Sequence, residues 1–205
     1  MLKNLAAWLA PPPIRTPEDL AGFIATESAR VAQKATTGYC RTKAGANHDL
    51  LFKEAGFLAA LDECRWSAYG LVAADICLVA EGFLRPAAAG AGEEALAAWV
   101  LAVYDGMLDA QPHPGRGPEG WSAEKAEMRA RLARSRMAEP IPPANVGFDT
   151  ARRIFDSLPV HPSLRREDFE VVQNLMRFGH VTFFDELSKR ADKAAIVAAL
   201  HQDSP

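Results

Sequence analysis

The sequence predicts an all-α fold, an irregular bundle of about six to eight helices built around two or three long helices. The main indication is the segment at residues 56–85, thirty residues without proline that are apolar on most faces. A second is that apolar residues elsewhere recur three or four positions apart, the spacing of one helix face. A third is the near absence of strand signals, since no alternating β-branched runs are joined by an Asn-Gly or Asp-Gly turn.

The N-terminal residues place Leu2, Leu5, Trp8 and Leu9 at helical spacing ahead of three prolines at positions 11–13. We therefore expect a short peripheral helix within residues 1–13. It either folds back onto the core or docks on a partner or a membrane surface. Docking on a membrane would be peripheral, through residues 2–10, and is the less favoured alternative.

A helix start follows at Thr16, with Pro17 at the first helical position and two acidic residues after it. The helix is predicted to run to about residue 43, where Gly45 supplies a stop. Its inner stripe comprises Leu20, Phe23, Ile24, Val31 and Tyr39.

The long apolar segment ends at Pro86, because proline disfavours a helical conformation in the residue before it. Residues 93–109 form the next amphipathic helix. Residues 111–120 are rich in proline and glycine, so we expect a flexible internal linker there.

Ser122 is predicted to cap a helix that carries Arg129, Arg131, Arg134 and Arg136 and is therefore expected to be well exposed. Prolines at 140, 142 and 143 close it. A shorter helix is expected at residues 148–158, a second long one at 166–190 and a last short one at 193–201.

The 205 residues, 49% of them apolar, suffice for a single helical domain over residues 1–205. A net charge of −3 gives no surplus of Lys and Arg, so we expect no nucleic-acid partner. Three cysteines without a CxxC pair indicate free thiols. With no convincing secretory signal and no transmembrane segment, we expect a cytoplasmic protein, and the alanine-rich composition is typical of a GC-rich bacterial genome.

No phosphate-binding loop, dinucleotide fingerprint, nucleophile elbow or HExxH motif is present, and no metal site is predicted. Chemistry in a helical bundle would then come from polar groups on inward faces. Helical spacing places four such groups among apolar neighbours: Glu27, Asp75, Asn174 and His180. A carboxylate-bridged di-iron site would need Glu-x-x-His on two helices, which this chain lacks.

Buried carboxylates are costly unless they are paired, so Glu27 and Asp75 each imply a partner. In one interpretation they meet basic, tyrosine or indole groups and only fix the packing register. In the other, a ligand-binding cavity holds a small molecule or cation among Glu27, Tyr39, Trp66, Asp75 and His180.

Two functions remain open from the sequence. The first is a helical interaction or regulatory protein, an adaptor or assembly factor that binds a protein partner or forms a homodimer, because four tryptophans and ten phenylalanines supply much apolar contact surface. The alternative is an all-helical enzyme or a carrier of a small ligand or cofactor, with the polar cavity in the bundle core. The sequence decides neither whether the chain is an enzyme nor which cofactor it would use.

Overall fold

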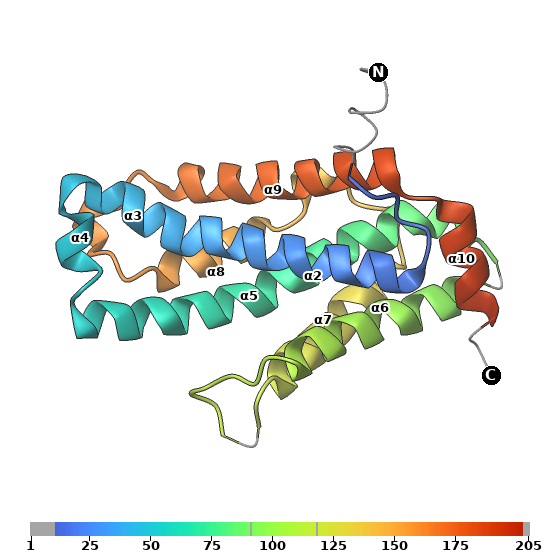
Figure 1. Cartoon of the computed structure of the whole chain (residues 1–205), viewed down its shortest axis with the longest axis horizontal. Coiled ribbons are helices and arrows are strands. Elements are labelled where there is room, and N and C mark those ends of the chain that lie inside the picture. The colour runs from blue at the N-terminus through green and yellow to red at the C-terminus, as the bar shows by residue number, and fades with distance from the viewer. Residues whose placement is uncertain (1–10, 91, 118, 203–205) are drawn as a thin grey trace, which may run out of the picture.

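The computed structural model describes residues 11–90, 92–117 and 119–202, and it confirms the all-α prediction over this part of the chain (Figure 1). The expected helix at residues 2–10 lies outside the described residues. The longer helices are α2 (Pro17–Gln33), α5 (Ala55–Leu84), α6 (Gly92–Asp109), α7 (Ser122–Ser135), α8 (Phe148–Ser157), α9 (Phe169–Arg190) and α10 (Lys193–Gln202). The short helices are α3 (Tyr39–Ala44) and α4 (His48–Leu51).

Helix α5 is the centre of the bundle, as the sequence predicts. It packs against α2, α6, α7, α8 and α9, and between residues 68 and 84 only Leu78 and Gly82 are partly exposed. By length and composition, residues 55–87 are also apolar enough to span a membrane, but 83% of the most apolar window is buried inside the domain. Burial by neighbouring helices accounts for its apolar composition.

Helix α2 begins as predicted, with Thr16 as its N-cap. The Thr16 hydroxyl accepts a hydrogen bond from the Asp19 backbone amide at 3.1 Å, and the Asp19 carboxylate accepts one from the Thr16 amide at 3.3 Å. The helix continues as a π-helical turn at Lys34–Gly38 and then as α3, which ends at Gly45 with φ of 54°. The apolar spacing did not indicate the π-helical turn.

Two other boundaries differ from the prediction. Trp121, not Ser122, is the N-cap residue of α7, and it makes no side-chain capping bond. Helix α9 begins at Phe169, not at residue 166, because a short 3₁₀ turn at Pro162–Leu164 and a bend precede it.

The described residues of the segment at 111–120 are non-helical, but side-chain contacts tie this segment to α5 and to the start of α7. His113 is 6% exposed, and its ring packs against two indoles, with ring centroids 5.7 Å from Trp66 and 5.1 Å from Trp121. The Trp121 indole N–H donates to the Gln111 carbonyl at 2.8 Å. The mobility of this loop stays a prediction.

Helices α2 and α9 cross closely at Gly179. A Cβ atom at Gly179 would lie 2.7 Å from Cγ2 and 3.0 Å from Cγ1 of Val31. A valine in a helix has one strongly preferred rotamer, so Val31 cannot turn both methyl groups away. The backbones of α2 and α9 therefore approach as closely as they do because position 179 has no side chain.

We predict that Gly179→Ala lowers the free energy of unfolding by about 1–3 kcal/mol, the range of an overpacked core, although alanine favours helix. The matched control is Gly106→Ala on α6, where no atom lies within 4 Å of the new Cβ. That change should raise stability by roughly 0.5–1 kcal/mol. Urea denaturation of both variants measures the difference, and equal effects would contradict the close crossing.

Candidate functional site

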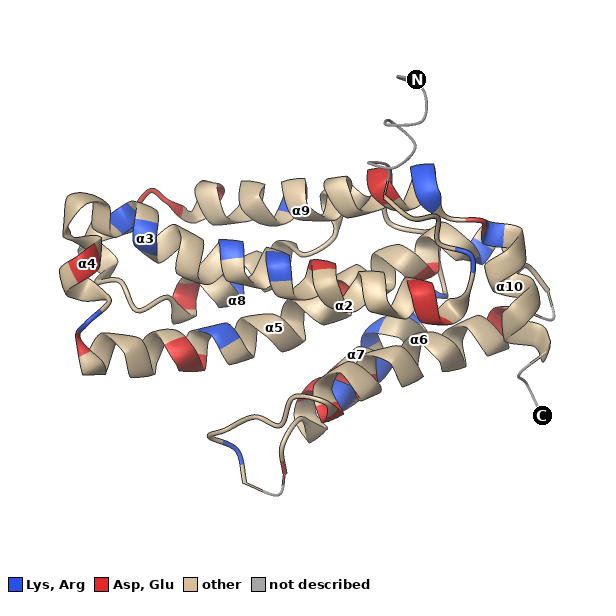
Figure 2. Cartoon of the chain, viewed as in Figure 1, with Lys and Arg blue, Asp and Glu red and all other residues tan. Residues whose placement is uncertain are grey.

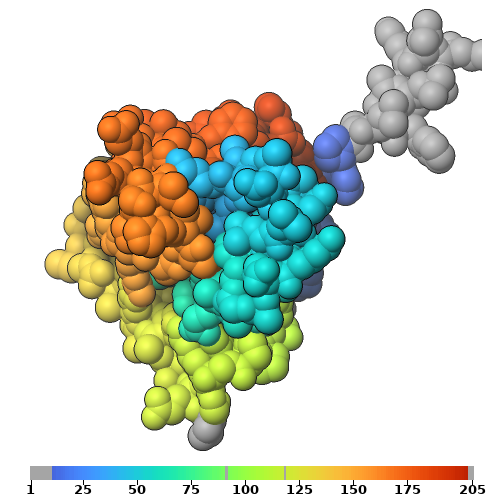
Figure 3. Space-filling model, turned by 90° about the vertical axis from the view of Figure 1, so that its left-hand side faces the viewer, coloured from blue at the N-terminus to red at the C-terminus, as the bar shows by residue number. Residues whose placement is uncertain are grey.

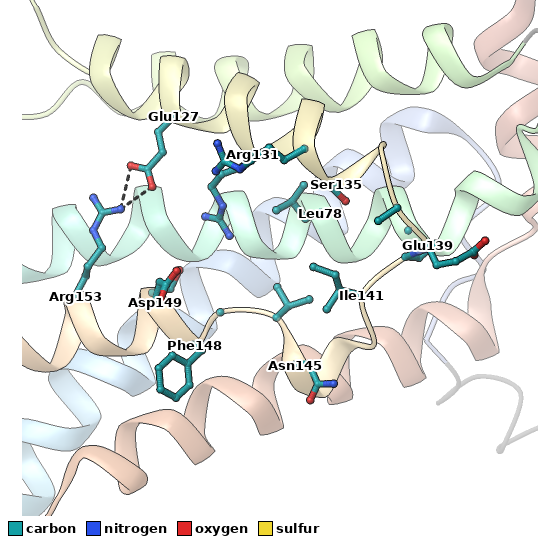
Figure 4. A pocket seen from close by; sticks show the side chains of 17 residues that line it. Leu78, Glu127, Arg131, Ser135, Glu139, Ile141, Asn145, Phe148, Asp149 and Arg153 are labelled. Atoms are coloured by element: carbon teal, nitrogen blue, oxygen red, sulfur yellow. Dashed lines mark hydrogen bonds and ion pairs between the residues drawn. The ribbon is translucent and has the colours of Figure 1, made fainter.

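A cavity of about 370 Å³ lies between α5, α7, the N-terminal half of α8 and the connection at residues 138–147 (Figure 4). Its floor is the stretch of α5 that other helices leave uncovered, at Leu78 and Gly82. Asp75 lies three residues before Leu78 and so shares this face of the helix. The α7 wall consists of Glu127, Arg131, Arg134 and Ser135.

Arg131, one partner of a buried ion pair, forms part of the inner wall. The Asp75 carboxylate is fully buried, and the Arg131 guanidinium donates a hydrogen bond to its Oδ1. Burial acts to lower the pKa of Arg131, but the charge of Asp75 and this hydrogen bond outweigh it and raise that pKa. The Arg131 side chain is 18% exposed and lines the cavity, so the same guanidinium contacts both the cavity and the buried Asp75.

His180 of α9 lies on the other side of Asp75 and is fully buried. Its Nδ1 is 3.2 Å from the Val146 carbonyl oxygen, which can only accept, so Nδ1 carries the proton. Its Nε2 is 3.8 Å from Asp75 Oδ2, too long for a hydrogen bond. Burial lowers the pKa of His180 more than the Asp75 charge raises it, so the ring is neutral near pH 7.

Gly147 separates this polar pair from the cavity. It has φ of 86°, and a Cβ atom there would lie 2.6 Å from both Asp75 Oδ2 and His180 Cε1. Both Asp75 Oδ2 and His180 Nε2 are buried without a hydrogen-bond partner among the described residues. Position 147 therefore requires glycine for two reasons, a left-handed backbone and contact with buried polar atoms.

A second buried carboxylate fixes the end of α7. Glu81, which is 2% exposed, accepts hydrogen bonds from Arg85 at 2.8 and 2.6 Å. Arg85 also donates to Ser135 Oγ at 3.0 Å and to the Ala138 carbonyl. Because Ser135 Oγ accepts here, its hydroxyl hydrogen stays available as a donor at the cavity wall.

Charges of both signs surround the opening of the cavity. Arg153 of α8 donates to both carboxylate oxygens of Glu127 at 2.7 and 3.0 Å, as the dashed lines in Figure 4 show. The Arg134 side chain makes no hydrogen bond or ion pair with any described residue. Figure 2 shows both acidic and basic residues along α7, which forms one wall of the cavity.

The residues proposed from the sequence do not line one cavity. Asp75 and His180 converge, whereas Glu27 pairs with Arg30 on its own helix. Tyr39 donates to Asp168 at 2.7 Å, which also binds Lys43 at 2.6 Å. Trp66 packs in the His113 cluster described above.

Two expectations are corrected. Asn174, expected on an inward face, is exposed. The arginines of α7 are not uniformly exposed, since Arg131 turns inward; its position three residues after the buried Met128 was the available signal. Sequence reasoning also missed the pair of Glu81 and Arg85, whose spacing of four residues on an apolar helix could have indicated it.

The cysteines do not supply a nucleophile. All three are buried, and burial raises the pKa of Cys40 and Cys77 to about 12. Among the described residues, no group of three or more His, Cys, Asp and Glu side chains is placed to hold a metal ion.

Comparison of the chain with protein-family models, with curated proteins and with solved structures finds no match. A functional proposal therefore rests on the geometry and chemistry of the site.

We predict that stability falls as the pH drops below about 6.5, the pKa of histidine in an unfolded chain. The buried, neutral His180 has a lowered pKa, so the unfolded state binds the proton first. Its contribution is complete above that pH and declines by up to about 1.4 kcal/mol per unit below it. The slope should vanish in His180→Gln between pH 7.5 and 5.5 in urea denaturation, and it should persist in His161→Gln, which alters an exposed ring.

Proposed function

We propose that this chain is a carrier or sensor of a small organic anion that has an apolar body, bound in the cavity between α5, α7 and α8. The observation that carries the proposal is a cavity over Leu78 and Gly82 of the central helix, which no other described helix covers there. It lies next to the buried Asp75–Arg131 pair. A cavity of about 370 Å³ is large enough for a small metabolite.

The polar end of the ligand is inferred from hydrogen-bond donors. Arg131 has five N–H groups, one of which binds Asp75, and the Arg134 side chain has no protein partner among the described residues. Ser135 adds a hydroxyl donor at the same wall. The carboxylate of Glu127 is already engaged by Arg153. Glu139 and Asp149 line other walls of the cavity, so the donors of the α7 wall favour a carboxylate or a similar anion there.

The apolar end of the ligand is inferred from side chains on the opposite wall. Ile141 is 53% exposed and Phe148 is 55% exposed, and both line the cavity with Leu78. A hydrocarbon or aryl group placed there would remove these apolar side chains from water.

Binding is supported better than catalysis. Asp75 and His180 are a fully buried titratable pair beside the cavity, but they lie behind Gly147 and neither lines it. A general acid or base must lie within hydrogen-bond reach of the group it protonates, and Gly147 prevents that contact.

We predict that sodium octanoate and 3-phenylpropionate raise the melting temperature of the protein, whereas their primary amides do not. A ligand at one hundred times its Kd stabilises by about 2.7 kcal/mol, or roughly 5–11 °C for a domain of this size. Differential scanning fluorimetry with rising ligand concentration measures the shift.

The blocking variant is Leu78→Trp, which fills the cavity and should abolish the shift. Its control is Leu58→Trp, an exposed position on the same helix, which should keep it. Arg134→Gln should reduce the shift for the acids. An equal response to acids and amides, or a shift that survives Leu78→Trp, would refute an anion site in this cavity.

A second candidate function, the interaction protein expected from the sequence, is favoured by one observation. Helix α9 exposes Val171 and Phe178 at 49% and 66% on one face of the domain. Exposed apolar side chains that align on a helix are typical of a protein interface.

A further inference from the structure

Helix α9 has two apolar stripes, and only one of them is buried. The inner stripe contains Val172, Met176, Phe183 and Leu187, all with exposures of 1% or less. The outer stripe contains Val171, Asn174, Phe178 and Val181, which recur at alternating spacings of three and four residues. That spacing is the a and d pattern of a helix that packs against another helix.

The outer stripe borders a groove. A depression of about 640 Å³ lies between the π-helical turn, α3 and α9, and Val171 and Leu175 form its α9 wall. Figure 3 shows the start of α9 beside the segment around α3 and α4 at this end of the domain. The groove and the exposed Phe178 ring therefore lie on one helix, seven residues apart, or about 10 Å along its axis.

We propose that a second copy of this chain docks on α9 in antiparallel orientation, with Phe178 of each copy in the groove of the other. Setting Val171 opposite Phe178 makes the contact reciprocal, as a two-fold interface requires. The ring then lies against Val171 and Leu175 in the groove, which removes it from water. This inference is independent of the ligand proposed for the cavity between α5, α7 and α8.

Asn174 supports a second copy rather than an unrelated helix. In this register Asn174 lies within one residue of the two-fold axis, so it meets Asn174 of the second copy. Its amide both donates and accepts, so two such side chains can satisfy each other. A single asparagine in an apolar seam fixes register and partner number in paired helices.

The charges beside the stripe are also self-complementary. Glu170 and Arg177 are exposed and seven residues apart on the same flank of α9. The same flanks meet in an antiparallel pair, so Glu170 of each copy faces Arg177 of the other. Arg177 donates from Nε to the Ala144 carbonyl at 3.1 Å, which leaves its terminal amino groups for a carboxylate.

We predict a dimer of twice 22.2 kDa in sedimentation velocity, which dissociates on dilution. Phe178→Glu should raise its dissociation constant at least about 30-fold, because a carboxylate replaces the ring that lies against Val171 and Leu175. The matched control is Leu58→Glu, an exposed apolar residue on α5 that should leave the dimer unchanged.

Charge reversal tests the orientation and controls for folding. Glu170→Arg and Arg177→Glu should each weaken the dimer, and the double variant should restore it, with far-UV circular dichroism unchanged. A monomer at all concentrations, a monomer that instead binds a different protein, or a dimer indifferent to Phe178→Glu would overturn the proposal. Failure of the double variant to recover would overturn the antiparallel register.

Discussion

The buried ion pair between Asp75 and Arg131 fixes how α7 lies across the central helix. Removing a carboxylate and a guanidinium from water is costly, and the pair is tolerated because each neutralises the other at hydrogen-bond distance. If either partner moved, the remaining charge would stand unpaired at the core. Helix α7 is therefore held at one position along α5, and the second tie, from Arg85 to the end of α7, follows from that position.

The cavity is a consequence of this arrangement. With α7 held at Arg131 and α8 begun at Gly147, the chain between them packs Pro140 against Gly82 but leaves Leu78 partly exposed at the cavity floor. Gly147 contacts Asp75 and His180 from outside and keeps them out of the cavity. The site thus offers arginine and serine donors, together with apolar side chains. Asp75 and His180 do not line it and serve the packing of the core. That combination suits binding more than proton transfer.

The sequence predicts the helices well, because apolar spacing, the Thr16 capping box and proline or glycine stops act locally. It also identifies Asp75 and His180 as inward polar groups. The partner of Asp75 is harder to predict, since Arg131 looks like its exposed neighbours until α7 is placed against α5. The exposure of the outer stripe of α9 is hard to predict for a related reason. Periodicity shows that a helix face is apolar, but tertiary packing decides whether another part of the chain covers it.

The most direct test of this account is a double-mutant cycle on the central ion pair, measured by urea denaturation. Asp75→Leu and Arg131→Met should each lower the free energy of unfolding by about 3 kcal/mol or more, because each leaves a charge unpaired. The double variant should lose clearly less than the sum, with a coupling of at least about 2 kcal/mol. Strictly additive losses would show that the two residues stabilise the fold independently, which would contradict an ion pair that holds α7 against α5.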